Sequence, residues 1–317
     1  MERARYDIEL RGFNAAPGTI DAVALRDLLD ALIGASEKAL RLALEGSSTR
    51  RGPKPTWLTD SVRFLITDLR EGSTIVPVQV PFLRDAAEDV VKQRDFWHAT
   101  PDPKATALTV LSEVIEDVAH NDRESLRYDK GVLKALGTFG RIITNGESIT
   151  IRDIETPGST FEITRRHIQQ AEALAHDTPD PFSVILSGTL DVIEHSQRAF
   201  RLLTAEGKTV RGSVESGAIT EQDMRELWGE SVTLQGNAHF TPGGTLRFIE
   251  TRTIGPARSS DTFFEQSKKH IEEKAASRQR PLAEQDPAQF DAGTDVQNSR
   301  GAWPGDESID EILDAID

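Results

Sequence analysis

Residues 199–214 are Ala-Phe-Arg-Leu-Leu-Thr-Ala-Glu-Gly-Lys-Thr-Val-Arg-Gly-Ser-Val, two short strand-like runs on either side of a glycine-bearing turn. Similar runs flank them, and Thr220 to Leu227 has the pattern of a short helix. The five runs are Val184 to Ile193, Ala199 to Leu203, Thr209 to Val214, Ser231 to Phe240 and Thr245 to Ile254. Five strands with one inserted helix in about 75 residues are typical of a small β-barrel of the OB or SH3 kind.

The chain before residue 178 mixes strand and helix patterns. Its longest apolar-periodic stretch predicts a helix from Ile20 to Leu44, and Ser125 to Ile142 predicts another. Ser61 to Leu69 and Thr74 to Val80 predict two paired strands, the second at a sheet edge because it contains Pro77. We therefore expect an α+β fold organised as an α+β domain (1–178), a small five-stranded β-barrel (182–257), a charged helix (258–280) and a flexible, disordered acidic tail with a short terminal helix (281–317).

The net charge is unevenly distributed. The chain has 37 basic and 52 acidic residues, a formal charge of −15. Residues 281–317 contain ten acidic residues and one basic residue, so well over half of that charge lies in the tail. Cysteine is absent, no apolar run approaches the length of a membrane helix, and the start lacks a signal-peptide pattern. These features predict a soluble, cytoplasmic protein with no membrane association.

The last residues of the tail have a helical apolar stripe. Ile309, Ile312, Leu313 and Ile316 occupy positions i, i+3, i+4 and i+7. A helix of roughly ten residues is marginal in water on its own, so this segment needs a surface to fold against. Trp303 precedes it as a buriable aromatic anchor. We expect these five residues to bind a protein partner, with docking onto the chain's own domain as the alternative.

Catalytic and cofactor motifs are missing from the sequence. No Gly-rich phosphate loop is present, and Gly212 to Gly217 only superficially approaches the nucleophile elbow Gly-x-Ser-x-Gly. The histidines are scattered without metal-ligand spacing: His98, His120, His167, His176, His195, His239 and His270. We expect no metal, no cofactor and no enzymatic activity, although a triad assembled from distant positions remains open.

The barrel is the natural candidate for nucleic-acid binding. Five arginines could share one face across its strands: Arg198, Arg201, Arg211, Arg247 and Arg252. From Val184 to Ala257, however, seven basic residues stand against nine acidic ones. A solvated barrel face is therefore the more ordinary interpretation. If the face does bind nucleic acid, the acidic tail would act as an intramolecular competitor.

Two segments carry a family resemblance. The chain resembles bacterial antitoxin-like proteins of toxin–antitoxin systems in two places. One is the barrel segment that begins with Gly188 to Ile193 and ends with Leu246 to Glu250, and the other is Trp303 to Ser308. The usual neighbours of such proteins are PIN-domain ribonuclease toxins. The resemblance covers about a quarter of the chain and implies that the tail stripe and Trp303 face a toxin. The chain is several times longer than a typical antitoxin and lacks a recognisable N-terminal DNA-binding helix or ribbon.

Overall fold

The computed structural model describes residues 1–13, 19–49, 53–67, 74–92, 101–144, 146–156, 159–194, 199–214, 221–258, 261 and 267–279. The chain divides into two units, Met1–Ala276 and Ser277–Asp317. The first unit holds two hydrophobic cores, one ending with Ala175 and the other beginning with Phe182. The expected acidic tail lies outside the described residues.

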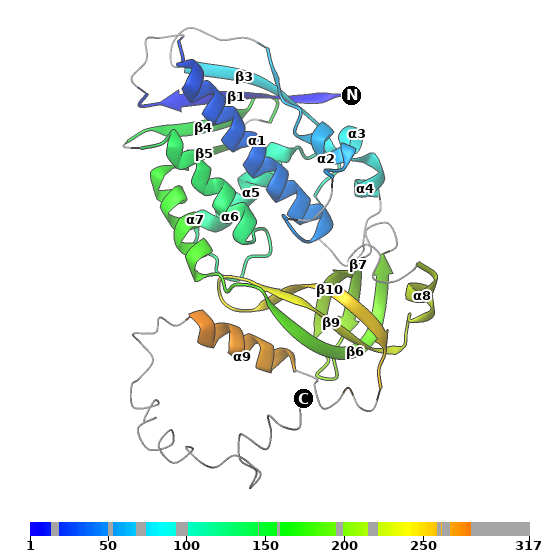
Figure 1. Ribbon diagram of the computed structural model, residues 1–317. Helices are drawn as coiled ribbons and strands as arrows, with labels where there is room; N and C mark the ends of the chain where they lie inside the picture. The colour runs from blue at the N-terminus through cyan, green and yellow to red at the C-terminus, as the bar shows by residue number, and fades with distance from the viewer. Residues whose placement is uncertain are drawn as a thin grey trace, which may run out of the picture. The chain divides into compact units, whose positions relative to one another are not determined.

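The α+β part is built on a five-stranded antiparallel sheet (Figure 1). Its order is β2-β3-β1-β4-β5, formed by β1 (Arg3–Arg11), β2 (Leu65–Ile66), β3 (Thr74–Pro81), β4 (Ser148–Asp153) and β5 (Thr160–Thr164). The central strand β1 alternates, with Ala4, Tyr6, Ile8 and Leu10 buried. This period of two gives the sheet one face for the core.

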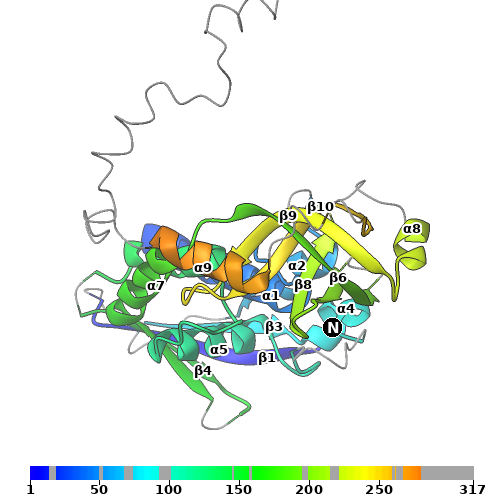
Figure 2. The ribbon, with the colours of Figure 1, turned by 90° about the horizontal axis from the view of Figure 1, so that it is seen from below.

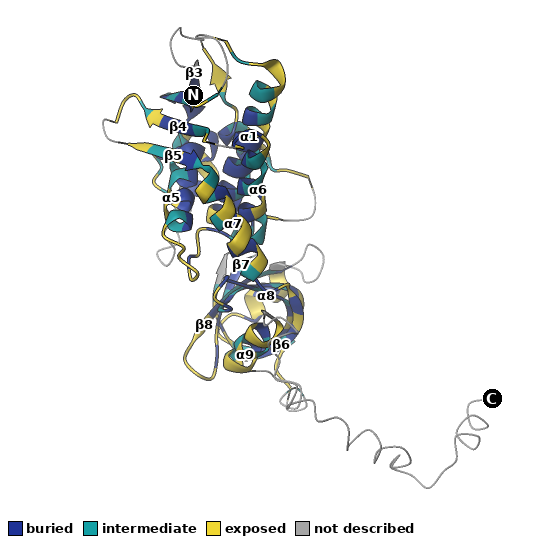
Figure 3. Ribbon diagram, turned by 90° about the vertical axis from the view of Figure 1, so that its left-hand side faces the viewer, coloured by how far each residue is buried: buried dark blue, intermediate teal, exposed yellow. Residues whose placement is uncertain are grey.

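Helices supply the other side of this core. They are α1 (Ala22–Glu45), α2 (Thr56–Ser61), α3 (Leu83–Ala86), α4 (Glu88–Lys92), α5 (Ala107–Ala119), α6 (Lys130–Gly137), the 3-10 helix η1 (Thr138–Arg141) and α7 (Arg165–Asp177). Helix α5 contacts β3 and β5, while α6 contacts both α1 and α7. Figure 3 shows buried residues concentrated where these helices meet the sheet. The predicted α+β class is confirmed.

Three sequence expectations for this part are wrong in detail. Ser61, the first residue of the expected strand Ser61 to Leu69, ends helix α2, and among the described residues 61–67 only Leu65–Ile66 form β2. β3 is not an edge strand, because β2 pairs with it at Val78 and Gln79. The expected helix from Ser125 begins only at Lys130, where the Asp129 side chain accepts hydrogen bonds from the first turn.

The second part is a closed five-stranded barrel. Its order is β10-β8-β7-β6-β9 around the barrel, formed by β6 (Phe182–Glu194), β7 (Ala199–Leu203), β8 (Thr209–Val214), β9 (Ser231–Phe240) and β10 (Leu246–Pro256). The β8–β10 pair is parallel and the other pairs are antiparallel. With α8 (Glu221–Glu226) between β8 and β9, this is a Greek-key barrel of the OB kind. The prediction of an OB-like barrel is confirmed.

The barrel core is closed by a helix from outside the strands. Helix α9 (Lys268–Gln279) contributes Ile271 and Ala275, both fully buried, to the apolar cluster of the barrel. The Glu272 carboxylate accepts a 3.0 Å hydrogen bond from the Leu246 amide at the start of β10. Figure 2 shows α8 and α9 with the barrel strands. The charged helix expected after the barrel therefore packs on it through its few apolar residues.

Candidate functional sites

Two of the five candidate arginines lie side by side on the barrel. Arg201 on β7 is directly opposite Arg211 on β8, and both side chains face outward because Leu202 and Val210 are buried. In OB-type barrels this face of the second and third strands binds oligonucleotides. Arg201 Nε, however, donates a 2.8 Å hydrogen bond to Asp191 Oδ2. A carboxylate thus compensates part of the charge of this arginine pair.

Arg247 does not share that solvent-facing surface. Its side chain is only 6% exposed, and its Nη2 lies 3.6 Å from Asp129 Oδ2 in the α+β part. Strands β9 and β10 pair Leu246 with Phe240 and Phe248 with His239, so Arg247 is the extra residue of a β-bulge. A bulge redirects a side chain away from the simple alternation. The expectation that Arg247 belongs to an exposed arginine face is corrected for this reason.

Asp129 joins three segments. Its Oδ1 caps α6 by accepting from the Gly131 and Val132 amides at 2.9 Å, and both carboxylate oxygens accept from Ser48, which follows α1. Burial raises the pKa of Asp129, but the Arg247 charge and these hydrogen bonds outweigh it and hold the pKa below 3.8. Asp129 is therefore an ionised, internally satisfied partner for Arg247.

Phe248 is buried in the same contact. A side chain added at Gly46, the C-cap of α1, would place its Cβ 3.1 Å from the Phe248 ring. Gly46 has a φ of 76°, so its backbone also favours glycine. Phe200 and Phe240 belong to the barrel core, whereas Phe248 lies outside that cluster. Strand β10 thus offers both an apolar and a charged side chain to the α+β part.

His239 on β9 faces this buried pair. Burial and the nearby Arg247 charge lower its pKa from 6.5 to about 4, against a smaller opposing effect of Asp129. Glu250 stands 3.9 Å away, and the side chain is 25% exposed. His239 is therefore neutral at pH 7, and no charge is added beside Arg247.

The remaining predicted residues are not brought together with these. Arg252 is exposed at a second bulge of β10, between Thr251 and Thr253. Other positions lie outside the described residues, namely Arg198 and the tail residues Trp303, Ile309, Ile312, Leu313 and Ile316. The structure therefore describes four of the five candidate arginines and divides them among a cross-strand pair, the buried Arg247 and the exposed Arg252.

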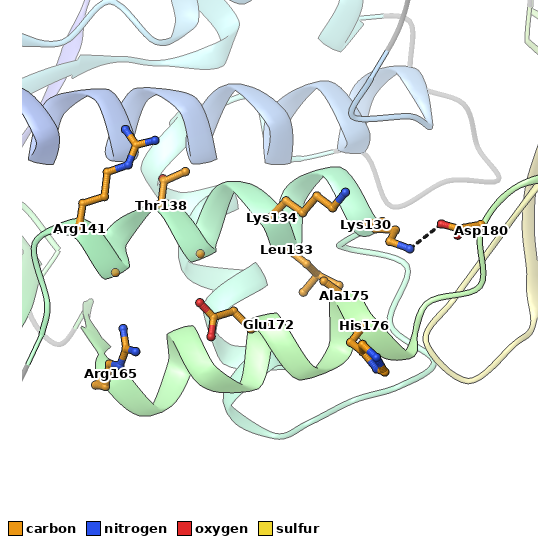
Figure 4. Close-up of a pocket in the computed structure, with 12 residues that line it drawn as sticks. Lys130, Leu133, Lys134, Thr138, Arg141, Arg165, Glu172, Ala175, His176 and Asp180 are labelled. Atoms are coloured by element: carbon orange, nitrogen blue, oxygen red, sulfur yellow. Dashed lines mark hydrogen bonds and ion pairs between the residues drawn. The ribbon is translucent and has the colours of Figure 1, made fainter. Parts of the chain in front are cut away.

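A groove that the sequence did not predict lies between α6 and α7. It has a volume of about 840 Å³, and its charged lining comes from both helices and from η1 (Figure 4). The lining residues are Lys130, Leu133, Lys134, Gly137, Thr138, Gly140, Arg141, Arg165, Glu172, Ala175, His176 and Asp180.

The described residues contain no group of three or more His, Asp or Glu side chains that could hold a metal ion. None of the helices described is long and apolar enough to cross a membrane. Comparison of the chain with family models, curated proteins and solved structures gave no match. The antitoxin-like resemblance therefore stays a prediction.

Proposed function

We propose that this chain is an antitoxin-like protein-interaction protein whose acidic C-terminal segment binds, and inhibits, a partner enzyme. The segment carries an apolar stripe at helical spacing, preceded by Trp303, and six acidic residues and no basic ones between Gly301 and Asp317. Such a stripe is the recognition element of helix-in-groove binding. The preferred partner surface is an apolar groove bordered by lysine and arginine.

The observation that supports the C-terminal segment over the barrel as the binding element is the burial of Arg247. A nucleic-acid face needs arginines that can reach phosphates, but Arg247 is paired with Asp129 and Arg201 with Asp191. Two of the five candidate arginines are thus already paired with carboxylates within the described residues. The resemblance to antitoxin-like proteins supports a PIN-type ribonuclease as the partner enzyme.

The proposal is tested by comparing the tagged full chain with a chain ending at Ala302. The full chain should retain a partner that the shortened chain loses, and the purified partner should bind the full chain directly. In the full chain, the double variant Ile312→Asp/Leu313→Asp should weaken that binding by at least a hundredfold, since each aliphatic side chain contributes about 1.5–3 kcal/mol when buried.

The matched control changes the polar side of the same stretch, as in Asp310→Ser/Asp314→Ser. It should weaken binding much less, because exposed ion pairs contribute about 0–1 kcal/mol each. Unchanged partner binding after deletion of residues 303–317 would show that the C-terminal segment is not the binding element. Ribonuclease activity of the purified partner, inhibited by the full chain only, would identify its class.

A second candidate function is single-stranded nucleic-acid binding by the barrel, favoured by the cross-strand pair Arg201 and Arg211. In this proposal the acidic segment competes with the nucleic acid. The chain ending at Ala302 should then bind oligothymidylate with a steep salt dependence, and Arg201→Glu should abolish binding while Arg252→Glu should not. Absence of binding at low salt would reject it.

A further inference from the structure

The groove between α6 and α7 collects cations that the rest of the described structure does not neutralise. Lys134 lies on α6, Arg141 ends η1, and Arg165 begins α7. Within the described ranges, none of these three side chains makes an ion pair. Figure 4 shows Lys134 and Arg141 on the α6 side and Arg165 on the α7 side. The fold thus concentrates positive charge in a concave place on an acidic protein.

The groove also contains negative charge, and its position restricts the ligand. At one end Lys130 Nζ lies 2.6 Å from Asp180 Oδ1, so this lysine is already compensated. Glu172 projects from α7 toward α6 and makes no ion pair with any residue that the structure describes (Figure 4). A ligand must therefore offer anionic groups to Lys134, Arg141 and Arg165 and hydrogen-bond donors to Glu172.

Two glycines of the lining let side chains of α7 approach the backbone of α6 and η1. A Cβ added at Gly140 would lie 3.2 Å from Arg165 Nη1, and one added at Gly137 would lie 3.9 Å from the Glu172 side chain. Arg165 and Glu172 thus pack against these glycines at the edge of the groove. The volume of about 840 Å³ is within the range of sites that hold ligands of several residues or drug size.

We propose that this groove binds an acidic polypeptide segment of another protein. A peptide carries carboxylates for the three cations and backbone N–H donors for Glu172. A nucleic-acid backbone has no donor at its phosphates and would bring a like charge beside Glu172. The site belongs to the α+β part and is independent of the partner proposed for the C-terminal segment.

The test uses fluorescein-labelled hexaglutamate and the full-length chain at low salt, followed by fluorescence anisotropy. Lys134→Glu/Arg165→Glu should weaken binding at least tenfold, because it removes two charge-assisted contacts and adds repulsion. The control Arg252→Glu/Lys269→Glu makes the same change in net charge at side chains that are exposed on β10 and α9. It should change the affinity by less than about threefold.

Equal losses in the two double variants would overturn the proposal, since they would indicate attraction to the whole protein surface. No binding to the unchanged chain would overturn it as well. An oligothymidylate with six phosphates that binds the groove as tightly as hexaglutamate would overturn the assignment to a peptide. Lys134→Gln/Arg141→Gln provides a milder second variant, and circular dichroism verifies that each variant is folded.

Discussion

Replacing His239 by glutamine should reduce the loss of stability that acid causes in this protein. The pKa of His239 is lowered from 6.5 to about 4, first by burial and then by Arg247. Between these two values the unfolded chain binds a proton that the folded chain does not. Stability therefore falls as the pH drops from 6.5 towards 4.

The size of the effect follows from the shift. A lowering of the pKa by about 2.5 corresponds to about 3–4 kcal/mol, since a change of one in pKa corresponds to about 1.4 kcal/mol. Partial exposure of the ring and the carboxylate of Glu250 at 3.9 Å reduce this to about 2 kcal/mol. His167, whose pKa is also lowered by burial, contributes in the same direction but is present in both proteins. The difference in acid-induced loss of stability between the two proteins therefore measures the contribution of His239.

The assay is urea denaturation at pH 7 and pH 4.5, followed by circular dichroism. The free energy of unfolding of His239→Gln should fall by about 2 kcal/mol less than that of the unchanged protein over this interval. His270→Gln, at an exposed position of α9, is the control and should follow the unchanged protein. The reasoning would be refuted if His239→Gln had the same pH dependence of stability as the unchanged protein. It would also be refuted if NMR showed the His239 imidazole of the unchanged protein titrating near pH 6.5.

Two further predictions concern packing around the barrel. Asp129→Ala should lower the free energy of unfolding by about 3–5 kcal/mol in urea denaturation, because it leaves Arg247 buried without a counter-charge. The double variant Asp129→Ala/Arg247→Met should lose less stability, and equal losses would contradict a coupling between the two residues. Gly212→Ala should destabilise the protein by at least about 1–3 kcal/mol, since its Cβ would lie 2.5 Å from the Ile249 carbonyl oxygen and from the Phe200 ring. Gly34→Ala in α1, where the added Cβ has nothing within 4 Å, should stabilise the protein by about 0.5–1 kcal/mol. Thermal melting compares the two variants, and similar shifts in melting temperature would contradict the predicted clash.

The barrel strands are the part of the fold that sequence predicts best. The predicted runs 199–203, 209–214 and 231–240 coincide with β7, β8 and β9 as the structure has them. β9 alternates between buried and outward residues without interruption, so a period of two is visible along its whole length. Glycines at the turns limit each run. Local pattern and tertiary packing agree in this part of the chain.

The side-chain directions that define a site are less predictable, because bulges interrupt the alternation. Asp191, Arg247 and Arg252 each occupy the extra position of a register shift in β6 or β10. Counting by twos through such a position assigns the wrong face to the residues beyond it. This is why the four candidate arginines that the structure describes divide into a cross-strand pair, a buried ion pair and an exposed residue.

The groove was missed for a different reason. Two of its cations, Lys134 and Arg141, precede the β4–β5 hairpin and the third, Arg165, follows it, so no local motif connects all three. The start of α6, by contrast, could have been predicted from the sequence. Asp129 is a favoured N-cap residue, and giving it weight would have shortened the predicted helix from Ser125.

The buried pair of Arg247 and Asp129 also affects whether the barrel can bind nucleic acid. A ligand that needed Arg247 would first have to expose Phe248, at a cost of about 2–3 kcal/mol for the aromatic ring alone. Its affinity would then be reduced by roughly a hundredfold, because only that fraction of molecules would be competent to bind. Arg201 and Arg211 lie opposite each other on β7 and β8, and Arg201 donates a hydrogen bond to Asp191. Two arginines offer few phosphate contacts at physiological salt, and this favours the C-terminal segment as the principal binding element.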